Sequence, residues 1–98
     1  MPDTLAPDDF RSLTEPFTLE VRVAGKLVPV ELTVESVESL PPHRLRALPF
    51  SLMLCGPRDP PLPQATYALR HPRLGVIELF LVPVGQDAQV TRYEVTFN

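Results

Sequence analysis

The residue best suited to covalent chemistry is Cys55, the single cysteine of this 98-residue chain. A thiol becomes a nucleophile only when a nearby base or positive charge lowers its pKa, so Cys55 would need a partner such as a histidine. It lies late in a predicted strand, beside Met53 and opposite the face that carries Leu52. Unpaired cysteines are among the most often buried residues. We therefore interpret Cys55 as a small buried hydrophobic side chain.

Two histidines and three arginines could bind an anion, provided that the fold brings them together. In a chain of antiparallel strands, successive loops lie at alternate ends of the sheet, so the loops near residues 43 and 72 share one end. Tyr67 would line the entrance at that end. The alternative is an ordinary solvated set of turn residues, which Asp3, Asp8 and Asp9 would neutralise. The predicted anion-binding residues are His43, Arg44, Arg46, His71 and Arg73.

Other patterns that carry enzyme chemistry are not found in the sequence. It contains no nucleophile elbow, paired-cysteine motif, His-x-x-x-His pair or glycine-rich phosphate loop. Two carboxylates on one predicted strand, Glu31 and Glu35, lie ~13 Å apart along that strand. This separation is larger than the spacing that glycoside hydrolysis uses. We expect a protein that is not an enzyme, with no catalytic residues, no metal ligands and no cofactor.

Hydrophobic residues recur with period two from Phe17 onward, which is typical of half-buried β-strands. The alternation slips phase at Ser36 in the second strand, which predicts a β-bulge. We expect one all-β domain at 17–98, in which about six antiparallel strands form a meander and a small barrel or sandwich. The predicted strands lie near residues 17–23, 28–34, 50–54, 66–69, 76–84 and 93–97.

The first sixteen residues form a polar segment that contains three prolines. Asp8 or Asp9 could cap one helical turn that carries Phe10, because a carboxylate satisfies free N–H groups at a helix start. Pro16 would end any longer helix. The predicted organisation is therefore an N-terminal segment at 1–16, with a possible helical turn, followed by the β domain.

The net charge of −3 limits the partners that we expect. Nucleic-acid binding normally requires a basic excess, which this chain lacks. The N-terminus lacks the basic and apolar regions of a signal peptide, and the longest apolar stretch, 76–84, is too short to span a bilayer. We expect a cytoplasmic protein that contacts neither nucleic acid nor membrane.

The fifth predicted strand has an unexpected second apolar face. A half-buried strand should be polar on its outer side. Here Val76, Phe80 and Val82 share that side, and Glu78 is the polar residue among them. Met53 lies on the outer side of the third predicted strand in the same way. The sequence therefore predicts a partner interface at Met53, Phe80 and Val82.

Two coverings for this apolar face remain open at the level of sequence. The N-terminal segment could fold over it as a lid, with Leu5, Phe10 and Leu13 in contact. Alternatively, another protein or a second copy of the chain could bind there, since exposed apolar patches mark interfaces.

Five runs of residues carry a family resemblance: FSLMLCGP at 50–57, LPQATY at 62–67, HPRLG at 71–75, LFLVPVG at 79–85 and YEVTFN at 93–98. With them, the chain from Phe10 onward resembles an uncharacterised family of bacterial proteins of about this length, a domain of unknown function. Members of that family are often encoded beside phage tail-collar and tail-fibre-like proteins. The resemblance thus implies an accessory role in a tail-like assembly, located in the cytoplasm or in a particle assembled there. It implies no catalytic residues.

Two functions remain open. The first is a structural or protein-interaction module that binds a protein partner or a second copy through its apolar outer face. The alternative is a small anionic-ligand-binding β-barrel with the histidines and arginines at its mouth. Six strands leave little interior room, since side chains nearly fill even eight-stranded barrels. We therefore favour the first function and do not expect a small-molecule ligand.

Overall fold

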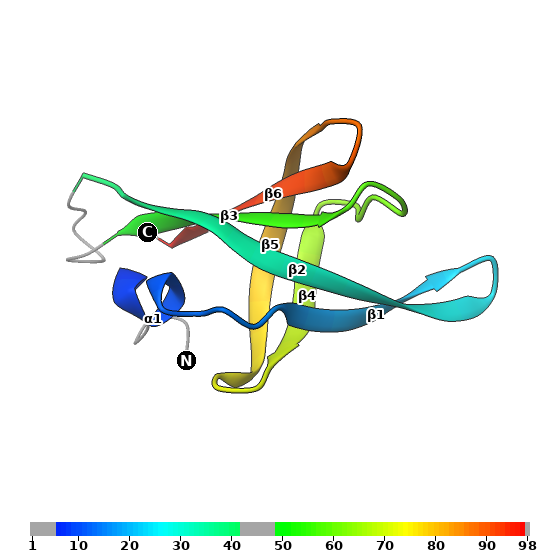
Figure 1. The fold of residues 1–98 in the computed structure, drawn as a ribbon, viewed down its shortest axis with the longest axis horizontal. Helices are drawn as coiled ribbons and strands as arrows, with labels where there is room; N and C mark the ends of the chain where they lie inside the picture. Colours follow the sequence, from blue (N-terminus) through cyan, green and yellow to red (C-terminus); the bar gives the residue numbers. More distant parts are fainter. Residues whose placement is uncertain (1–5, 42–48, 98) are drawn as a thin grey trace.

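The computed structural model describes residues 6–41 and 49–97, which contain one helix and six strands (Figure 1). The all-β barrel and the short N-terminal helix that the sequence predicts are confirmed. No helix in these two ranges is long and apolar enough to cross a membrane. The elements are α1 (Pro7–Arg11), β1 (Phe17–Val23), β2 (Lys26–Ser39), β3 (Phe50–Pro57), β4 (Ala65–His71), β5 (Gly75–Gln86) and β6 (Val90–Phe97).

The strands follow the order β1-β2-β3-β6-β5-β4 around the closed barrel, and all neighbouring pairs are antiparallel. This order differs from a simple meander at two junctions, because β3 pairs with β6 instead of β4, and β1 pairs with β4 instead of β6. The barrel therefore consists of two three-stranded meanders, β1–β3 and β4–β6. The proline-rich segment 58–64 permits this order because it carries the chain across the barrel end from β3 to β4 (Figure 1).

The hydrophobic core lies inside the barrel, where alternate residues of each strand meet, as the period-two pattern predicts. The core is tightly packed at Gly56: a Cβ atom there would lie 2.5 Å from Cδ2 of Leu32, a side chain that is itself buried. The buried hydrophobic side chains of the strands are Phe17, Leu19, Val30, Leu32, Phe50, Leu52, Leu54, Leu69, Ile77, Leu79, Leu81, Tyr93, Val95 and Phe97.

Helix α1 closes one end of the barrel with Phe10. This side chain is fully buried, and its ring centroid lies 6.4, 5.8 and 5.5 Å from those of Phe17, Phe50 and Phe97. Asp9 helps to start the helix, since its Oδ2 accepts a hydrogen bond from the backbone N–H of Ala6 at 2.7 Å. The short helix therefore places one aromatic side chain in the core.

The proline-rich segment closes the opposite end with Leu62. Its side chain is 3% exposed, and its backbone N–H donates a hydrogen bond to Oη of Tyr93 at 2.8 Å. The buried tyrosine thus gains a polar partner, as such residues normally require. Because side chains fill both ends, the barrel interior is a core rather than a ligand chamber.

Two local features shape the hairpin of β1 and β2. Ala24 and Gly25 form its two-residue turn, with φ angles of 51° and 81°, which is typical of a type I′ hairpin. β2 pairs first with β1 and then, from Thr33, with β3. The register shift between Val34 and Ser36 confirms the predicted bulge and makes Glu35 the extra residue.

Candidate functional site

The outer side of β5 carries the apolar row that the sequence predicts. We call Val76, Phe80, Val82 and Val84 the β5 face. Val76, Phe80 and Val84 are 68, 49 and 50% exposed, and Val82 is half-buried. Met53 on β3 is also half-buried, and Glu94 of the intervening strand β6 lies between it and Val82. The structure thus places the three predicted interface residues on one outer surface.

The N-terminal segment does not cover the β5 face in the described part of the chain. Phe10 lies in the core at the barrel end, and Leu13 packs against the same core. The lid, one of the two coverings left open by the sequence, is therefore wrong for these two residues, because the open barrel end offers them deeper burial than the outer surface of β5. Leu5, the third residue of the predicted lid, lies outside the described residues.

Charged side chains border the β5 face. Glu78 projects from β5 itself, and Glu94 on β6 is the register partner of both Val82 and Met53. Arg70 on β4 pairs with Val76 at the far end of the row. The surroundings of Phe80 and Val82 are therefore acidic, with a basic residue at the Val76 end.

Cys55 belongs to a polar cluster on the outer surface of β2, β3 and β6. Nε of Arg92 donates hydrogen bonds to both carboxylate oxygens of Glu35 at 2.9 and 3.2 Å, and its Nη1 donates to Oδ2 of Asp87 at 2.9 Å. Cys55 is half-buried, not fully buried as predicted, and burial together with a hydrogen bond to Glu35 raises the pKa of its thiol. The thiol therefore stays protonated at neutral pH, whereas a nucleophile needs the thiolate.

The predicted anion-binding patch is described in part. His71 ends β4, and Arg73 lies in the turn that follows. Tyr67 does not join them, because it lies four residues earlier on the same strand, ~13 Å away. The hydroxyl of Tyr67 instead donates a hydrogen bond to the carbonyl of Pro63 at the other end of the barrel. The remaining predicted residues, His43, Arg44 and Arg46, lie outside the described residues.

His71 connects two segments of the chain through its buried ring. It is 3% exposed, and its ring lies 4.9 Å from the ring of Phe17. The backbone N–H of Arg73 donates to Nδ1 at 3.1 Å, so the ring proton is on Nε2, which donates to the carbonyl of Glu15 at 3.2 Å. Nε of Arg73 lies 3.5 Å from a carboxylate oxygen of the same Glu15. Both ring nitrogens of His71 are thus used within the chain, and the anion-binding role of the patch stays a prediction.

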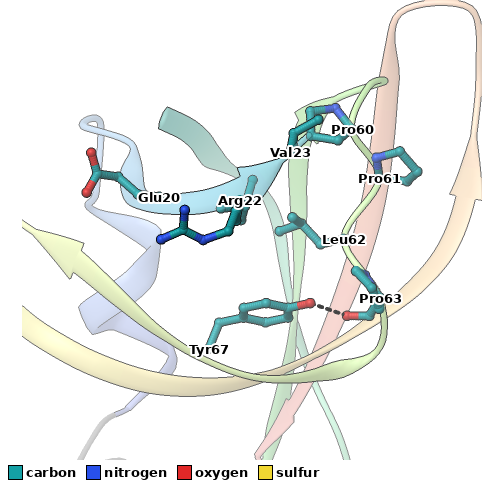
Figure 2. A pocket seen from close by; sticks show the side chains of 9 residues that line it. Glu20, Arg22, Val23, Pro60, Pro61, Leu62, Pro63 and Tyr67 are labelled. Atoms are coloured by element: carbon teal, nitrogen blue, oxygen red, sulfur yellow. Dashed lines mark hydrogen bonds between the residues drawn. The ribbon is translucent and has the colours of Figure 1, made fainter. Parts of the chain in front are cut away.

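A groove that the sequence pattern did not reveal opens between β1 and the proline-rich segment (Figure 2). It has a volume of about 330 Å³ and is lined by β1 residues 20–23, residues 60–63 and Tyr67. In Figure 2, Leu62 lies between β1 and Tyr67, and the tyrosine hydroxyl points to Pro63. The prolines around Leu62 are visible in the sequence, but they do not predict a groove beside β1.

The side chains that could carry chemistry are engaged by other groups of the described chain. Among residues 6–41 and 49–97, no group of three or more His, Cys, Asp and Glu residues could hold a metal ion. The nucleophile candidate Cys55 is hydrogen-bonded to a carboxylate, and His71 is engaged on both nitrogens. The described surface instead offers an apolar strand face and a groove.

A family model described as a domain of unknown function (DUF6916) matches residues 5–97. The chain belongs to this family, because the match covers nearly its whole length. No curated protein and no solved structure matches the chain. The resemblance to a small domain of unknown function is therefore confirmed at the level of the family.

Proposed function

We propose that this member of the family is a non-enzymatic structural module that binds a protein partner through the β5 face. The observation that carries the proposal is the row of Val76, Phe80 and Val84, each about half exposed or more, on a barrel whose interior is already filled. Burying one such side chain fully contributes ~1.5–3 kcal/mol. The row can therefore supply the central contacts of an interface, where most binding energy is concentrated.

The charges around the β5 face favour a partner other than a second copy. Glu78 and Glu94 flank Phe80 and Val82, so two copies packed through this region would bring four carboxylates together. Like charges across an interface are repulsive and suppress that pairing. We therefore propose a different protein, with an apolar centre bordered by lysine or arginine side chains that face Glu78 and Glu94.

The setting that we propose for this partner is a tail-like assembly, for which the family resemblance is the support. A non-enzymatic role agrees with a thiol held in its protonated form and with a histidine used as a structural tie. A structural component needs a rigid barrel and a surface that recognises its neighbour, and it needs no reactive group.

The first test is the mass of the purified protein in solution, measured by sedimentation equilibrium up to millimolar concentration. We expect a monomer of 10.9 kDa for both the unaltered chain and Phe80→Glu. Because Phe80 is 49% exposed, the substitution gives up only its half-buried part and should lower the stability of the monomer by about 1 kcal/mol. A dimer that Phe80→Glu dissociates would overturn the proposal of a different partner.

The second test compares variants for capture of a partner from extracts of the source cells. We expect one protein to be retained by the unaltered chain and lost with Phe80→Glu, and its retention to fall with Glu94→Lys. Lys26→Glu is the control, since Lys26 is exposed at the turn of the hairpin of β1 and β2. Capture that is equally sensitive to Lys26→Glu, or insensitive to Phe80→Glu, would exclude the β5 face as the binding surface.

A further inference from the structure

The seam between β1 and β4 is the weakest junction of the barrel. In the described chain, the register between these strands contains one pair of residues, Thr18 and Arg70, whereas β1 and β2 are paired from Phe17 to Val23. Beyond Thr18 the described register contains no further pair between β1 and β4, and the end of the hairpin of β1 and β2 projects away from β4 (Figure 1). The outer part of β1 is therefore an edge strand on the side that faces β4.

The hairpin geometry shows which backbone groups lie on that edge. In a two-residue hairpin, the residues that close the turn, here Val23 and Lys26, bond to each other, and bonding to the partner strand then alternates. Val21 and Val23 thus direct their N–H and C=O groups toward β2. Glu20 and Arg22 direct theirs toward the open seam, where another extended chain could bond to them.

The other edge of the same hairpin is protected by a proline. Pro29 lies opposite Glu20, at a position whose backbone nitrogen faces away from β1. The register of β2 with β3 begins only at Thr33, so this part of β2 is also an edge in the described chain. Proline removes the donor that an added strand would need, which is a common protection of edges. The β1 edge at 18–23 contains no proline.

The groove of Figure 2 lies directly beside this unprotected edge and is apolar at its floor. Leu62 and Tyr67 form that floor, with prolines on the far wall. A second hollow of about 400 Å³ continues along the seam toward Arg70, and Glu20 and Tyr67 line both hollows. The two hollows therefore follow the edge of β1 and could accept apolar side chains of a strand laid along it.

The charges that line the seam favour an acidic strand. Arg22 and Arg70 each line one of the two hollows, and Glu20 is the single carboxylate in their lining. On an added strand, side chains alternate between the groove and the outer surface. A strand that alternates apolar and acidic residues would therefore match both the floor and the two guanidinium groups.

We propose that the edge of β1 at Glu20 and Arg22 binds an extended acidic–apolar peptide segment of a partner protein by strand addition. The backbone of the segment bonds to the N–H and C=O groups of these two residues. Its apolar side chains enter the groove over Leu62, and its carboxylates face Arg22 and Arg70. This site adjoins the β5 face along β4, where Arg70 borders both surfaces, but it does not depend on the function proposed above.

The first measurement is amide hydrogen exchange of the full chain without a ligand. We expect fast exchange at Glu20 and Arg22 and slow exchange at Val21, whose N–H is bonded within the hairpin. Exchange at Glu20 and Arg22 as slow as that at Val21 would show that the backbone groups of the edge are already hydrogen-bonded, and would overturn the proposal.

The second measurement is an NMR titration with a capped seven-residue peptide that alternates valine with glutamate. We expect saturable shifts at the amides of 20–23 and 66–68, and weaker binding when lysine replaces glutamate in the peptide. Shifts centred on Phe80, or no shifts at millimolar peptide, would overturn the proposal.

Two variants at one position separate the backbone contact from the charge. Arg22→Pro removes both the edge N–H and the guanidinium, whereas Arg22→Ala removes only the guanidinium. We expect Arg22→Pro to bind the peptide about tenfold more weakly than Arg22→Ala, because it loses a main-chain hydrogen bond in addition. The amide spectrum of each variant confirms that it is folded, and equal affinities would contradict strand addition.

Discussion

The two ends of the barrel are closed in different ways. At one end, Phe10 enters the core and packs among three phenylalanine rings at centroid distances from 5.5 to 6.4 Å. At the other end, the proline-rich segment lays Leu62 over the opening and is held there by polar contacts. The carbonyl of Arg58 accepts hydrogen bonds from Gln86 Nε2 at 2.8 Å and from Thr91 Oγ1 at 3.1 Å.

This difference shows how one small barrel combines stability with an accessible site. The aromatic end buries a large apolar side chain completely, so it should dominate the free energy of unfolding. The proline-rich end is fixed at a few points by hydrogen bonds, which leaves β1 free to separate from β4 beside it. The groove and the open strand edge therefore occur at the end that contributes less to the core.

The largest expected effect is the loss of Phe10. Phe10→Ala should lower the free energy of unfolding by ~3–5 kcal/mol, because it removes the transfer energy of the ring and leaves a cavity among three other aromatic side chains. Leu62→Ala at the opposite end should cost less, since the open groove allows its surroundings to relax. Urea denaturation monitored by circular dichroism measures both variants.

Val76→Ala is the control for these two substitutions. Val76 is 68% exposed, so its truncation should change the free energy of unfolding by less than ~0.5 kcal/mol. A cost for Leu62→Ala that equals or exceeds that of Phe10→Ala would show that the two ends contribute alike and would contradict the comparison.

A smaller effect is expected at the hydrogen bond between Tyr93 and Leu62. Tyr93→Phe keeps the buried ring but leaves the backbone N–H of Leu62 without its acceptor, which should cost ~1–3 kcal/mol. Tyr67→Phe is the matched control, because its hydroxyl is at the groove, where water can replace it. Thermal unfolding should show a larger loss of stability for Tyr93→Phe than for Tyr67→Phe. The reverse result would show that the hydrogen bond of Tyr93 does not fix the proline-rich segment.

Much of the fold could be predicted from the sequence because strand period and turn residues are local signals. The period-two alternation of hydrophobic residues predicts all six strands, and the phase slip at Ser36 predicts the bulge that the structure places at Glu35. The strand order could not be obtained in this way. It depends on the pairing of β3 with β6 and of β1 with β4, which joins residues far apart in the chain and carries no local pattern.

For the candidate surfaces, too, local patterns were predictable from the sequence and long-range contacts were not. The β5 face was predictable, because a strand that is apolar on both sides is visible in the alternation of Val76, Phe80 and Val82. The inward position of His71 continues the alternation of Tyr67 and Leu69, but its hydrogen bond to Glu15, 56 residues earlier in the chain, was not predictable from that pattern. The groove was not predictable either, because it depends on how far β1 and β4 remain paired.

The smallest expected effect is a pH dependence at the turn between β5 and β6, beside the proline-rich segment. The N–H groups of Gln89 and Val90, together with Arg92, hold the pKa of Asp87 at about 2, below its ordinary value of 3.8. The unfolded chain therefore takes up this proton first as the pH falls, so the contribution of Asp87 to stability is present above pH ~4 and is lost toward pH ~2. Asp87→Asn keeps the shape of the side chain but not its titration.

We expect the difference in unfolding free energy between the unaltered chain and Asp87→Asn to shrink as the pH falls from 5 to 2. Denaturant unfolding at each pH measures that difference. Carboxylates remote from Asp87 cancel because both proteins contain them, whereas Glu35 also contributes to the change because it shares Arg92 with Asp87. The same comparison for Phe10→Ala should give a difference that does not change with pH, since no titrating group is removed from the aromatic end. A constant difference for Asp87→Asn would mean that the charge of Asp87 does not stabilise the turn. The hydrogen bonds of the Arg58 carbonyl and of Tyr93 would then be the remaining polar contacts argued to hold this end of the barrel.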